Sequence, residues 1–240
     1  MQRKGTAIVT GASRGIGAAI VGEFLTRGYR VVATFRNVTK AGFVPSPNLT
    51  LVDGEIGEEG TAEKVAQTAL ASFGSIDHVV NNAGIFWAKP FTEYTAEEFR
   101  EFVSTNLNGF IFITQTAVRQ MLVQGIGGSV TTITASLADN PIAGVTASIP
   151  MITKGGLEAI TRSLASEYAK ANIRFNAVAP GVVDTSLHEK TPRDFMKSLS
   201  PLGSIVDAED IAEAVLYLTE AHHVTGEVLH VDGGAHSGRW

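Results

Sequence analysis

The sequence predicts an α/β fold in which a doubly wound parallel sheet of about seven strands carries helices on both faces. Short runs rich in β-branched residues alternate with longer amphipathic segments at least six times along the chain, a pattern typical of parallel sheets covered by helices. A glycine-rich turn joins the first such pair. Hydrophobic residues make up 44% of the 240 residues, which is enough for a large core, and we expect a single domain over residues 1–240.

The expected strands are short apolar runs bounded by turn residues, and the expected helices are longer amphipathic stretches, several of which end at a glycine. We expect strands at 6–9, 30–35, 49–52, 78–80, 130–134, 174–178 and 227–231. We expect helices at 15–27, 60–73, 95–124, 151–171 and 208–218, and a loop with two prolines at 44–48. Residues 184–206 are the least regular part of the chain, and we expect them to form a flexible lid beyond the carboxyl ends of the strands.

The composition argues against several classes of protein. The chain has 19 Lys and Arg against 24 Asp and Glu, a net charge of -5, so it lacks the basic surface expected of a protein that binds nucleic acid or anionic membranes. It has no cysteine, which excludes disulfides, thiolate metal sites and thiol nucleophiles. No apolar run approaches the roughly 20 residues of a membrane helix, and no secretory signal precedes the first strand. We expect a cytoplasmic protein without a metal site.

The turn after the first expected strand has the form of a dinucleotide-binding loop. Its glycines follow the spacing Gly-x-x-x-Gly-x-Gly at Gly11, Gly15 and Gly17. Gly11 permits a tight turn, Gly15 lets the backbone approach a diphosphate, and Gly17 lets the helix pack closely on the sheet. The helix N-terminus supplies N–H donors and the positive end of a dipole. The residues expected to contact the dinucleotide here are Gly11, Ser13, Arg14, Gly15, Ile16 and Gly17.

Further motifs follow one another along the chain. They are Asn81-Asn82-Ala83-Gly84 after the fourth strand, Asn106 in the long helix, Ser136 after the fifth strand, Pro180-Gly181 after the sixth, and Val224–Gly226 with Val231–Gly234 near the end. Together with the glycine loop, they make the chain similar to the short-chain dehydrogenase/reductase family over essentially its whole length, and within it to bacterial 3-oxoacyl-acyl-carrier-protein reductases. The resemblance implies a Rossmann-type fold, a nicotinamide dinucleotide cofactor, a small-molecule substrate and a homodimer or homotetramer.

The end of the second strand favours NADP(H) over NAD(H). Residues 32–37 contain no carboxylate that would bind the adenosine ribose and repel a 2′-phosphate, whereas Arg36 and Arg14 are placed to pair with that phosphate. By resemblance, Glu55 stands beside the adenine, with Asp53 as a nearby alternative. The other residues that the resemblance places at the cofactor are Asn37, Ile56, Asn82, Ala83, Gly84, Lys154, Pro180, Gly181, Val183 and Thr185.

The family's catalytic pattern is present except for one residue. In the family, a Tyr protonates the carbonyl oxygen, and a Lys one helical turn later lowers the Tyr pKa and holds the nicotinamide ribose. A Ser orients the carbonyl, and an Asn supports a water that relays protons. Ser136, Asn106 and Lys154 match the Ser, the Asn and the Lys. At the Tyr position, four residues before Lys154, stands Pro150.

Proline at the first position of a helix costs no hydrogen bond, so the helix that carries Lys154 should be intact. What is missing is the phenol that would donate the proton. A water held by Lys154 and Asn106 is the first candidate to replace it, and the Ser136 hydroxyl is the second. Weaker candidates are Tyr94, Ser148, Asp139 and His188.

Two functions are compatible with this pattern. The first is an NADPH-dependent reductase of a small carbonyl or enoyl compound with an altered proton donor, which the retained Ser136, Asn106 and Lys154 favour. The second is a non-catalytic NADP(H)-binding sensor or partner-binding protein, which Pro150 favours. An NAD-linked dehydrogenase working in the oxidative direction fits the two arginines less well. The residues that indicate an apolar substrate pocket are Phe86, Trp87, Ile142 and Phe195.

Overall fold

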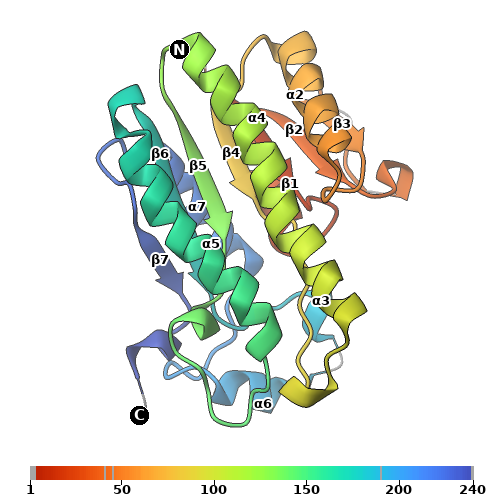
Figure 1. The fold of residues 1–240 in the computed structure, drawn as a ribbon, viewed down its shortest axis with the longest axis vertical. Helices are drawn as coiled ribbons and strands as arrows, with labels where there is room; N and C mark the ends of the chain where they lie inside the picture. The colour runs from red at the N-terminus through yellow and green to blue at the C-terminus, as the bar shows by residue number, and fades with distance from the viewer. Residues whose placement is uncertain (1–3, 41, 45, 190, 239–240) are drawn as a thin grey trace.

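The centre of the molecule is one sheet of seven parallel strands in the order β3-β2-β1-β4-β5-β6-β7 (Figure 1), within residues 4–40, 42–44, 46–189 and 191–238, which the computed structural model describes. The strands are β1 (Thr6–Thr10), β2 (Arg30–Phe35), β3 (Leu49–Asp53), β4 (His78–Asn81), β5 (Gly128–Ile133), β6 (Ile173–Pro180) and β7 (Val228–Val231). The chain builds the sheet from β1 in one direction and, after crossing to β4, in the other. The predicted doubly wound α/β fold is confirmed.

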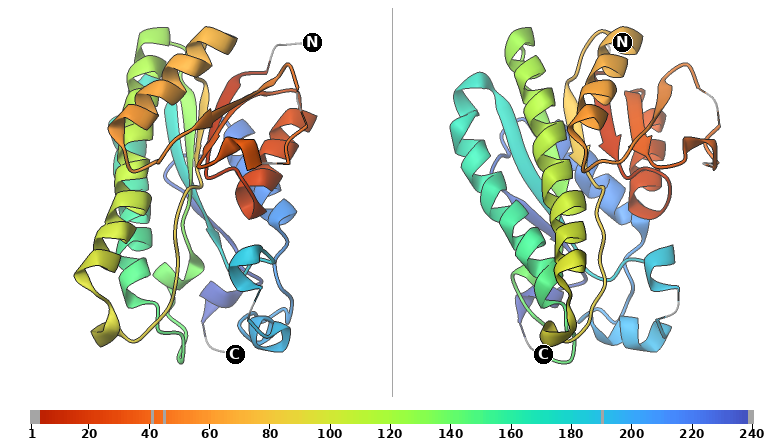
Figure 2. Two further views of the ribbon diagram at one scale, coloured as in Figure 1. Left: turned by 90° about the vertical axis from the view of Figure 1, so that its right-hand side faces the viewer. Right: turned by 45° about the vertical axis from the view of Figure 1, so that its right-hand side comes forward.

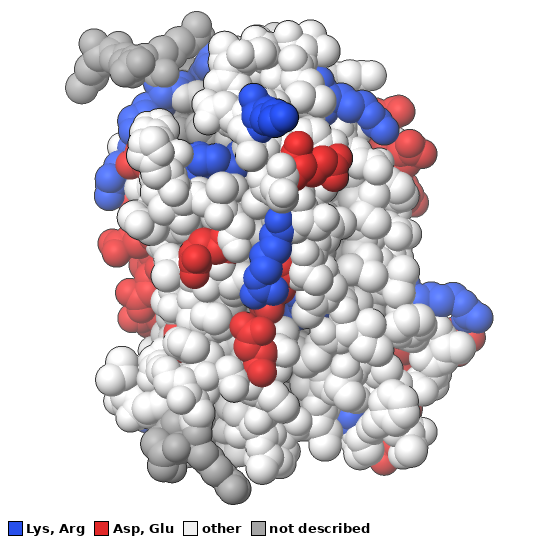
Figure 3. Space-filling model, turned by 60° about the vertical axis from the view of Figure 1, so that its left-hand side comes forward, with Lys and Arg blue, Asp and Glu red and all other residues white. Residues whose placement is uncertain are grey.

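Helices cover both faces of this sheet. They are α1 (Gly15–Thr26), α2 (Glu59–Phe73), α3 (Ala96–Phe102), α4 (Gly109–Gln124), α5 (Ser148–Glu167), α6 (Arg193–Ser198) and α7 (Ala208–Glu220). In Figures 1 and 2, α2, α4 and α5 lie on one face and α1 and α7 on the other. Among the described residues, no helix is both long and apolar enough to cross a lipid bilayer. On the surface displayed in Figure 3, basic and acidic side chains are interspersed.

Alternate residues of the central strands build the two halves of the core. Ala7 and Val9 of β1 meet Phe24 of α1 and Val215 of α7 in one cluster of buried side chains. Ile8, between them, belongs to the other cluster, with α2 and α4. Successive side chains of a strand point to opposite faces, so an unbroken apolar strand requires cover on both faces. The apolar runs of the sequence thus lead to three layers.

The prediction of one continuous α-helix at 95–124 is wrong in the middle of that range. A π-helical turn, Val103–Asn108, joins α3 to α4; such turns are rare and often occur at functional sites. The loop after β3 presses against this turn, because a Cβ on Gly57 would lie 2.8 Å from the carbonyl oxygen of Ser104. The turn adapts the helix to a loop that is distant in sequence, so a local helical pattern does not reveal it.

The helix that carries Lys154 is intact, but it begins earlier than predicted. It starts at Ser148, so Pro150 is its third residue and not its first, and it ends at Glu167, before a 3-10 turn at 169–171. The N–H groups of a first turn have no partner within the helix, so proline at the third position also removes no hydrogen bond. The remaining elements begin and end within about two residues of the prediction.

The segment predicted to be a flexible lid has secondary structure of its own. Residues 184–206 contain a 3-10 turn, Ser186–His188, and helix α6. Val183 pairs with Val206 in an isolated parallel bridge that closes the segment at its base. The flexibility of this lid stays a prediction. Residue 190 of this segment, Pro45 of the predicted loop, and residues 1–3 and 239–240 lie outside the described residues.

A buried arginine fastens α7 to β6. Arg174 is 8% exposed, and its guanidinium donates to the carbonyl oxygens of Leu218 (2.6 Å), Thr219 (2.6 Å) and Val224 (3.3 Å). The carbonyls of Leu218 and Thr219 belong to the last turn of α7, which offers them no partner within the helix. One side chain therefore supplies hydrogen bonds that the helix end lacks, and it anchors that end to the sheet.

We expect Arg174→Leu to lower the free energy of unfolding by about 3 kcal/mol, because it leaves three carbonyls without this donor. Urea denaturation followed by circular dichroism measures the change. Arg100→Leu is the control, since Arg100 is exposed and pairs with the exposed Glu97, and we expect it to leave stability nearly unchanged. Equal losses in the two variants would contradict the anchoring role.

Candidate active site

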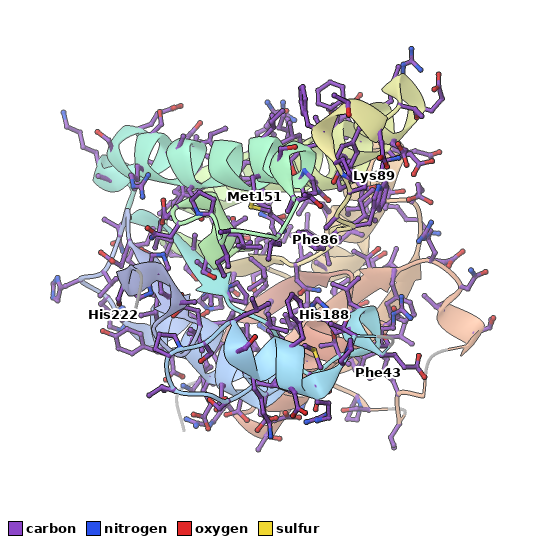
Figure 4. All side chains as sticks on the ribbon, turned by 90° about the horizontal axis from the view of Figure 1, so that it is seen from below. Phe43, Phe86, Lys89, Met151, His188 and His222 are labelled. Atoms are coloured by element: carbon purple, nitrogen blue, oxygen red, sulfur yellow. The ribbon has the colours of Figure 1, made fainter. Side chains whose placement is uncertain are left out.

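A cavity of about 860 Å³ lies at the carboxyl ends of the strands. Doubly wound sheets bind ligands at this edge, and the volume lies in the range of small-molecule sites. Figure 4 looks onto the cavity, with Phe86 and His188 on opposite sides of it. Of the residues predicted first for cofactor and catalysis, leaving aside the alternatives taken up below, Asn106 alone is absent from the lining. The predicted residues in the lining are Gly11, Ser13, Arg14, Gly15, Ile16, Gly17, Arg36, Asn37, Glu55, Ile56, Asn82, Ala83, Gly84, Ser136, Lys154, Pro180, Gly181, Val183 and Thr185.

The glycine loop is held against the loop that follows β4. The Thr10 hydroxyl accepts hydrogen bonds from the backbone N–H groups of Asn82 (3.1 Å) and Ala83 (2.9 Å). In return, the Asn82 amide donates to the carbonyls of Thr10 (2.9 Å) and Gly11 (3.0 Å). Gly11 has a φ of +64°, and a Cβ there would lie 2.6 Å from the Cα of Ala83. Glycine is therefore required for the contact between the two loops.

The first turn of α1 is open for an anion. Its N-cap residue, Arg14, makes no side-chain capping bond, and the turn contains no acidic residue. A Cβ on Gly17 would collide with the Gly11 carbonyl oxygen, so the missing side chain brings the helix against the loop. Open N–H groups and the positive dipole end of a helix bind phosphate groups. The loop and the helix therefore fit the diphosphate of a dinucleotide.

An arginine and a glutamate face each other in the part of the cavity next to β2 and β3. Arg36 Nη1 lies 3.6 Å from Glu55 Oε2, and both side chains are exposed. Such an exposed pair is weak, so Arg36 is able to turn to a phosphate group. Asp53, the alternative to Glu55, ends β3 outside the cavity lining and accepts a hydrogen bond from the Val38 N–H (3.2 Å). The structure places Glu55, and not Asp53, at the cavity.

Lys154 contributes a buried cation to the cavity wall. The side chain is 8% exposed, and Nζ donates a hydrogen bond to the Ile133 carbonyl oxygen at 2.8 Å. Burial lowers the pKa of Lys154 to about 8, while the nearby Glu158 carboxyl opposes this change. An ammonium group carries three N–H donors, so two remain for a ligand. Lys154 is a charged group that releases its proton close to neutral pH.

Asn106 braces the walls of the cavity. Its Oδ1 accepts a hydrogen bond from the Ile85 N–H (2.8 Å), and its Nδ2 donates to the Ile85 carbonyl oxygen (3.2 Å) and the Thr153 hydroxyl (3.0 Å). The Thr153 hydroxyl in turn donates to the Pro150 carbonyl oxygen (2.8 Å). The side chain of Asn106 therefore joins the π-helical turn to the loop after β4 and to α5. Both amide hydrogens are taken, which leaves one lone pair on Oδ1.

The predicted substitutes for a phenol differ in where they lie. Asn106 and Lys154 converge, because a Cβ on Gly84 would lie 3.3 Å from both Asn106 Oδ1 and Lys154 Nζ. Ser136 and His188 line the cavity. The Tyr94 hydroxyl instead donates to the Trp87 carbonyl oxygen (2.9 Å). The candidates outside the lining are Tyr94, Ser148 and Asp139.

Two polar residues that lie behind the cavity lining, next to Asn106 and Lys154, were not predicted. The Thr153 hydroxyl accepts a hydrogen bond from the Asn106 amide. Glu158 lies one helical turn beyond Lys154, with only 2% of its surface exposed. A signal for Glu158 was present, because residues four apart share a face of a helix and a face that buries a lysine also buries its neighbour. Thr153 had no such signal, since its partner belongs to another helix.

Apolar side chains from the loops after β4, β5 and β6 form an apolar wall of the cavity. Phe195, predicted to join this wall, lies outside the lining and is 49% exposed; it sits on the short helix α6, whose buried face is occupied by Met196. The other predicted pocket residues do line the cavity. The residues of this apolar wall are Ile85, Phe86, Trp87, Leu137, Ile142, Val145, Leu187 and Leu199.

Known proteins resemble the chain in sequence and in structure. Residues 11–236 match the family model described as enoyl-(acyl carrier protein) reductase. Carbonyl reductase family member 4 of Xenopus tropicalis is 34% identical over 94% of this chain and 95% of its own. Granaticin polyketide synthase putative ketoacyl reductase 2 of Streptomyces violaceoruber is 36% identical over 96% of this chain and 95% of its own.

Solved structures superpose on nearly the whole chain. ElxO with NADP bound has a TM-score of 0.91 and 26% identity, covering 99% of this chain and 100% of its own. A form of ElxO with Phe in place of one Tyr, described with NADPH bound, has the same TM-score of 0.91. The 3-ketoacyl-(acyl-carrier-protein) reductase from Brucella melitensis, complexed with NADH, has a TM-score of 0.90 and 28% identity, covering 97% of this chain and 98% of its own.

The lowered pKa of the buried Lys154 leads to a prediction of how the free energy of unfolding depends on pH. The pKa of Lys154 is lower in the folded chain, about 8, than in the unfolded chain, 10.5. The unfolded state therefore binds more protons between these values, and the free energy of unfolding should rise by about 3 kcal/mol from pH 8 to pH 10.5. Urea denaturation across this range measures the rise. Lys154→Met should abolish it, whereas Lys170→Met, at an exposed position, should retain it; an unchanged rise in Lys154→Met would refute the assignment.

Proposed function

Because the chain belongs to the short-chain dehydrogenase/reductase family, we propose that it is an NADPH-dependent oxidoreductase that reduces a small, apolar carbonyl or enoyl compound. The observation that carries the proposal is that Ser136 and Lys154 share one cavity with the glycine loop. Relatives described as carbonyl and ketoacyl reductases support the class of reaction. Structures of ElxO with NADP and NADPH support the cofactor.

In this proposal, each part of the cofactor has a partner in the cavity. The glycine loop and the first turn of α1 hold the diphosphate. Arg36 and Arg14 bind the 2′-phosphate, Glu55 lies beside the adenine, and Lys154 donates to the nicotinamide ribose. When bound, the cofactor supplies the hydride. The protein's part is to place the substrate and to supply a proton.

The substrate binds between the apolar wall and Ser136. Ser136 is a buried residue, 4% exposed, and its hydroxyl donates a hydrogen bond to the substrate oxygen and stabilises the negative charge that develops there. The apolar wall, which includes Phe86 and Ile142, binds an alkyl or acyl chain and excludes water. Exclusion of water strengthens the electrostatic effect of nearby charges. This part of the cavity therefore favours a neutral substrate with one polar oxygen.

Lys154 supplies the proton. Pro150, one helical turn earlier on α5, has no hydrogen to donate. An acid works best when its pKa lies near the working pH, and the pKa of Lys154 is lowered to about 8 by burial. The ammonium group gives its proton to the substrate oxygen, directly or through a water between Lys154 and Asn106. Ser136 orients the substrate for this transfer.

A second candidate function is a non-catalytic NADP(H)-binding protein, which the absence of a donor at Pro150 favours. Both candidates bind NADPH, and only the reductase consumes it. Fluorescence titration with NADPH, followed by addition of ketones, β-keto thioesters and enoyl thioesters, separates them. Consumption with any of these compounds supports the reductase. Tight binding without consumption by the whole panel favours the second candidate, and no binding of NADPH would exclude both.

We expect Pro150→Tyr to raise the rate of ketone reduction by at least about tenfold, because a phenol one turn before Lys154 adds a positioned acid to the site. The oxidation of NADPH, followed by its absorbance, measures the rate. Pro150→Phe is the matched control: it adds the ring without the hydroxyl and should give no increase. A Pro150→Tyr variant that binds NADPH like the wild type and reduces no member of the panel would count against the reductase.

We expect Arg36→Ala to weaken NADPH binding about tenfold to a hundredfold and to leave NADH binding nearly unchanged, because a charged hydrogen bond to phosphate contributes about 1.5–3 kcal/mol. Fluorescence titrations with the two nucleotides measure both affinities. Arg119→Ala, which removes an exposed arginine of α4, is the control and should change neither affinity. An equal loss for the two nucleotides would show that Arg36 does not select the 2′-phosphate.

A further inference from the structure

A second group of titratable side chains lies behind Lys154, away from the cavity lining. Glu158 is on the next turn of α5, on the same face as Lys154, and is 2% exposed. Its Oε1 has no hydrogen-bond partner among the described residues. The carboxyl group faces the Thr134 side chain at the end of β5 and the Asp139 carboxyl in the following turn. A buried carboxyl with an unpartnered oxygen costs free energy, so such groups are rare in folded proteins and call for an explanation.

This group extends from Lys154 to the surface. Asp139 Oδ2 lies 3.1 Å from His230 Nε2, and 37% of the Asp139 side chain is exposed. The His230 ring stacks on His236, with 3.9 Å between the ring centroids. Residues of α5, the turn after β5, and β7 therefore form a line of proton-binding groups, in which Lys154 and Glu158 interact electrostatically without a direct ion pair. One end is at the cavity and the other is in contact with water.

The electrostatic environment suits proton exchange along this line. Burial, the largest cause, and the adjacent Asp139 carboxyl raise the pKa of Glu158 well above the usual carboxyl value. Burial lowers the pKa of Lys154 to about 8, which Glu158 opposes. The pKa of Glu158 is therefore raised toward that of Lys154, and the pKa of Lys154 is lowered toward that of Glu158. The charged or titratable groups around Glu158 are Lys154 and Arg162 on its own helix, Asp139 in the turn after β5, and His230 on β7, behind Asp139.

We propose that Glu158 and Asp139 form a carboxyl pair that shares a proton and returns protons from solvent to Lys154 during turnover. This inference rests on the proposed function, in which Lys154 protonates the substrate. Glu158 acts through Lys154 and does not touch the substrate, so it is a positioning residue. A substrate that fills the apolar cavity excludes water from it, and a route behind α5 lets protons return without passing the substrate.

The steps of the relay balance. The Lys154 ammonium group transfers one proton to the substrate oxygen, as a hydride from NADPH reaches the substrate carbon, and is left as a neutral amine. A bridging water carries the proton of the Glu158 carboxyl to the amine: the amine gains an N–H bond from the water, and the water regains its proton as the Glu158 O–H bond breaks. Glu158 is reprotonated by Asp139, which takes a proton from water, with His230 as its neighbour. One turnover consumes one NADPH and one proton from solvent.

The first test requires no turnover. NADPH affinity should decline at high pH as Lys154 loses its charge, and the midpoint of this decline reports the Lys154 pKa. We expect Glu158→Gln to move the midpoint down by about half a pH unit or more, because the carboxylate that opposes the effect of burial is gone. Glu213→Gln, at an exposed position of α7, is the matched control and should leave the midpoint in place. An unmoved midpoint in Glu158→Gln would overturn the coupling to Lys154.

The second test follows turnover with the substrate that the panel identifies. We expect Glu158→Gln to lower kcat about tenfold or more with KM nearly unchanged, and to alter the pH profile of kcat. Glu158→Asp, which keeps a titratable group, should recover part of the rate, and Glu213→Gln should behave like the wild type. Asp139→Asn, at the more exposed partner, tests the same route if Glu158→Gln fails to fold, as judged by circular dichroism.

The outcomes separate the relay from the function on which it rests. Wild-type turnover with unchanged kcat and pH profile in both Glu158→Gln and Asp139→Asn would overturn the relay and leave the reductase standing. A wild-type protein that consumes NADPH with no member of the panel would overturn the proposed function, and the relay with it. A fall in kcat with a changed pH profile in both variants, recovered in part by Glu158→Asp, supports the relay.

Discussion

Backbone contact between the loops that follow β1 and β4 is the constraint on which the cavity depends. Thr10 and Asn82 hold these loops together through four hydrogen bonds, and Gly11 leaves no room for a side chain between them. The same loop positions the first turn of α1, because Gly17 packs against the Gly11 carbonyl. The glycine-loop end of the cavity is therefore as well defined as the sheet from which the two loops emerge.

A second set of contacts places the polar end of the site. The amide of Asn106 links the loop after β4 to Thr153 of α5, and Lys154 follows directly in the chain. Burying an ammonium group costs free energy, which its hydrogen bond to Ile133 offsets only in part. The cost has a chemical consequence, because the same burial brings the pKa of Lys154 close to neutral. A lysine whose pKa stayed at its ordinary value would be a poor acid at neutral pH.

Pro150 keeps the helix that positions Lys154 but offers no side-chain proton donor. In the first turn of α5 a proline removes no helical hydrogen bond, and its carbonyl still accepts the Thr153 hydroxyl. The chain therefore keeps the helix and the position of Lys154 without a phenol. The same helix carries Glu158 on its buried face, so the group proposed to recharge Lys154 is placed by the periodicity of α5. Proline in place of a tyrosine at residue 150 removes one proton donor from the site and leaves α5 intact.

The sequence by itself determined the fold class and most of the cavity lining. Apolar strands require helices on both faces, and residues that follow parallel strands meet at one edge of the sheet, so Gly11, Asn82, Ser136 and Thr185 were predictable as neighbours. Tertiary structure alone decided the π-helical turn at 103–108, the position of Asp53 outside the cavity lining, and the contact of Asp139 with His230. The reason is physical: these features depend on contacts between segments distant in the chain, and periodicity reports only the environment of a residue, not the identity of its neighbours.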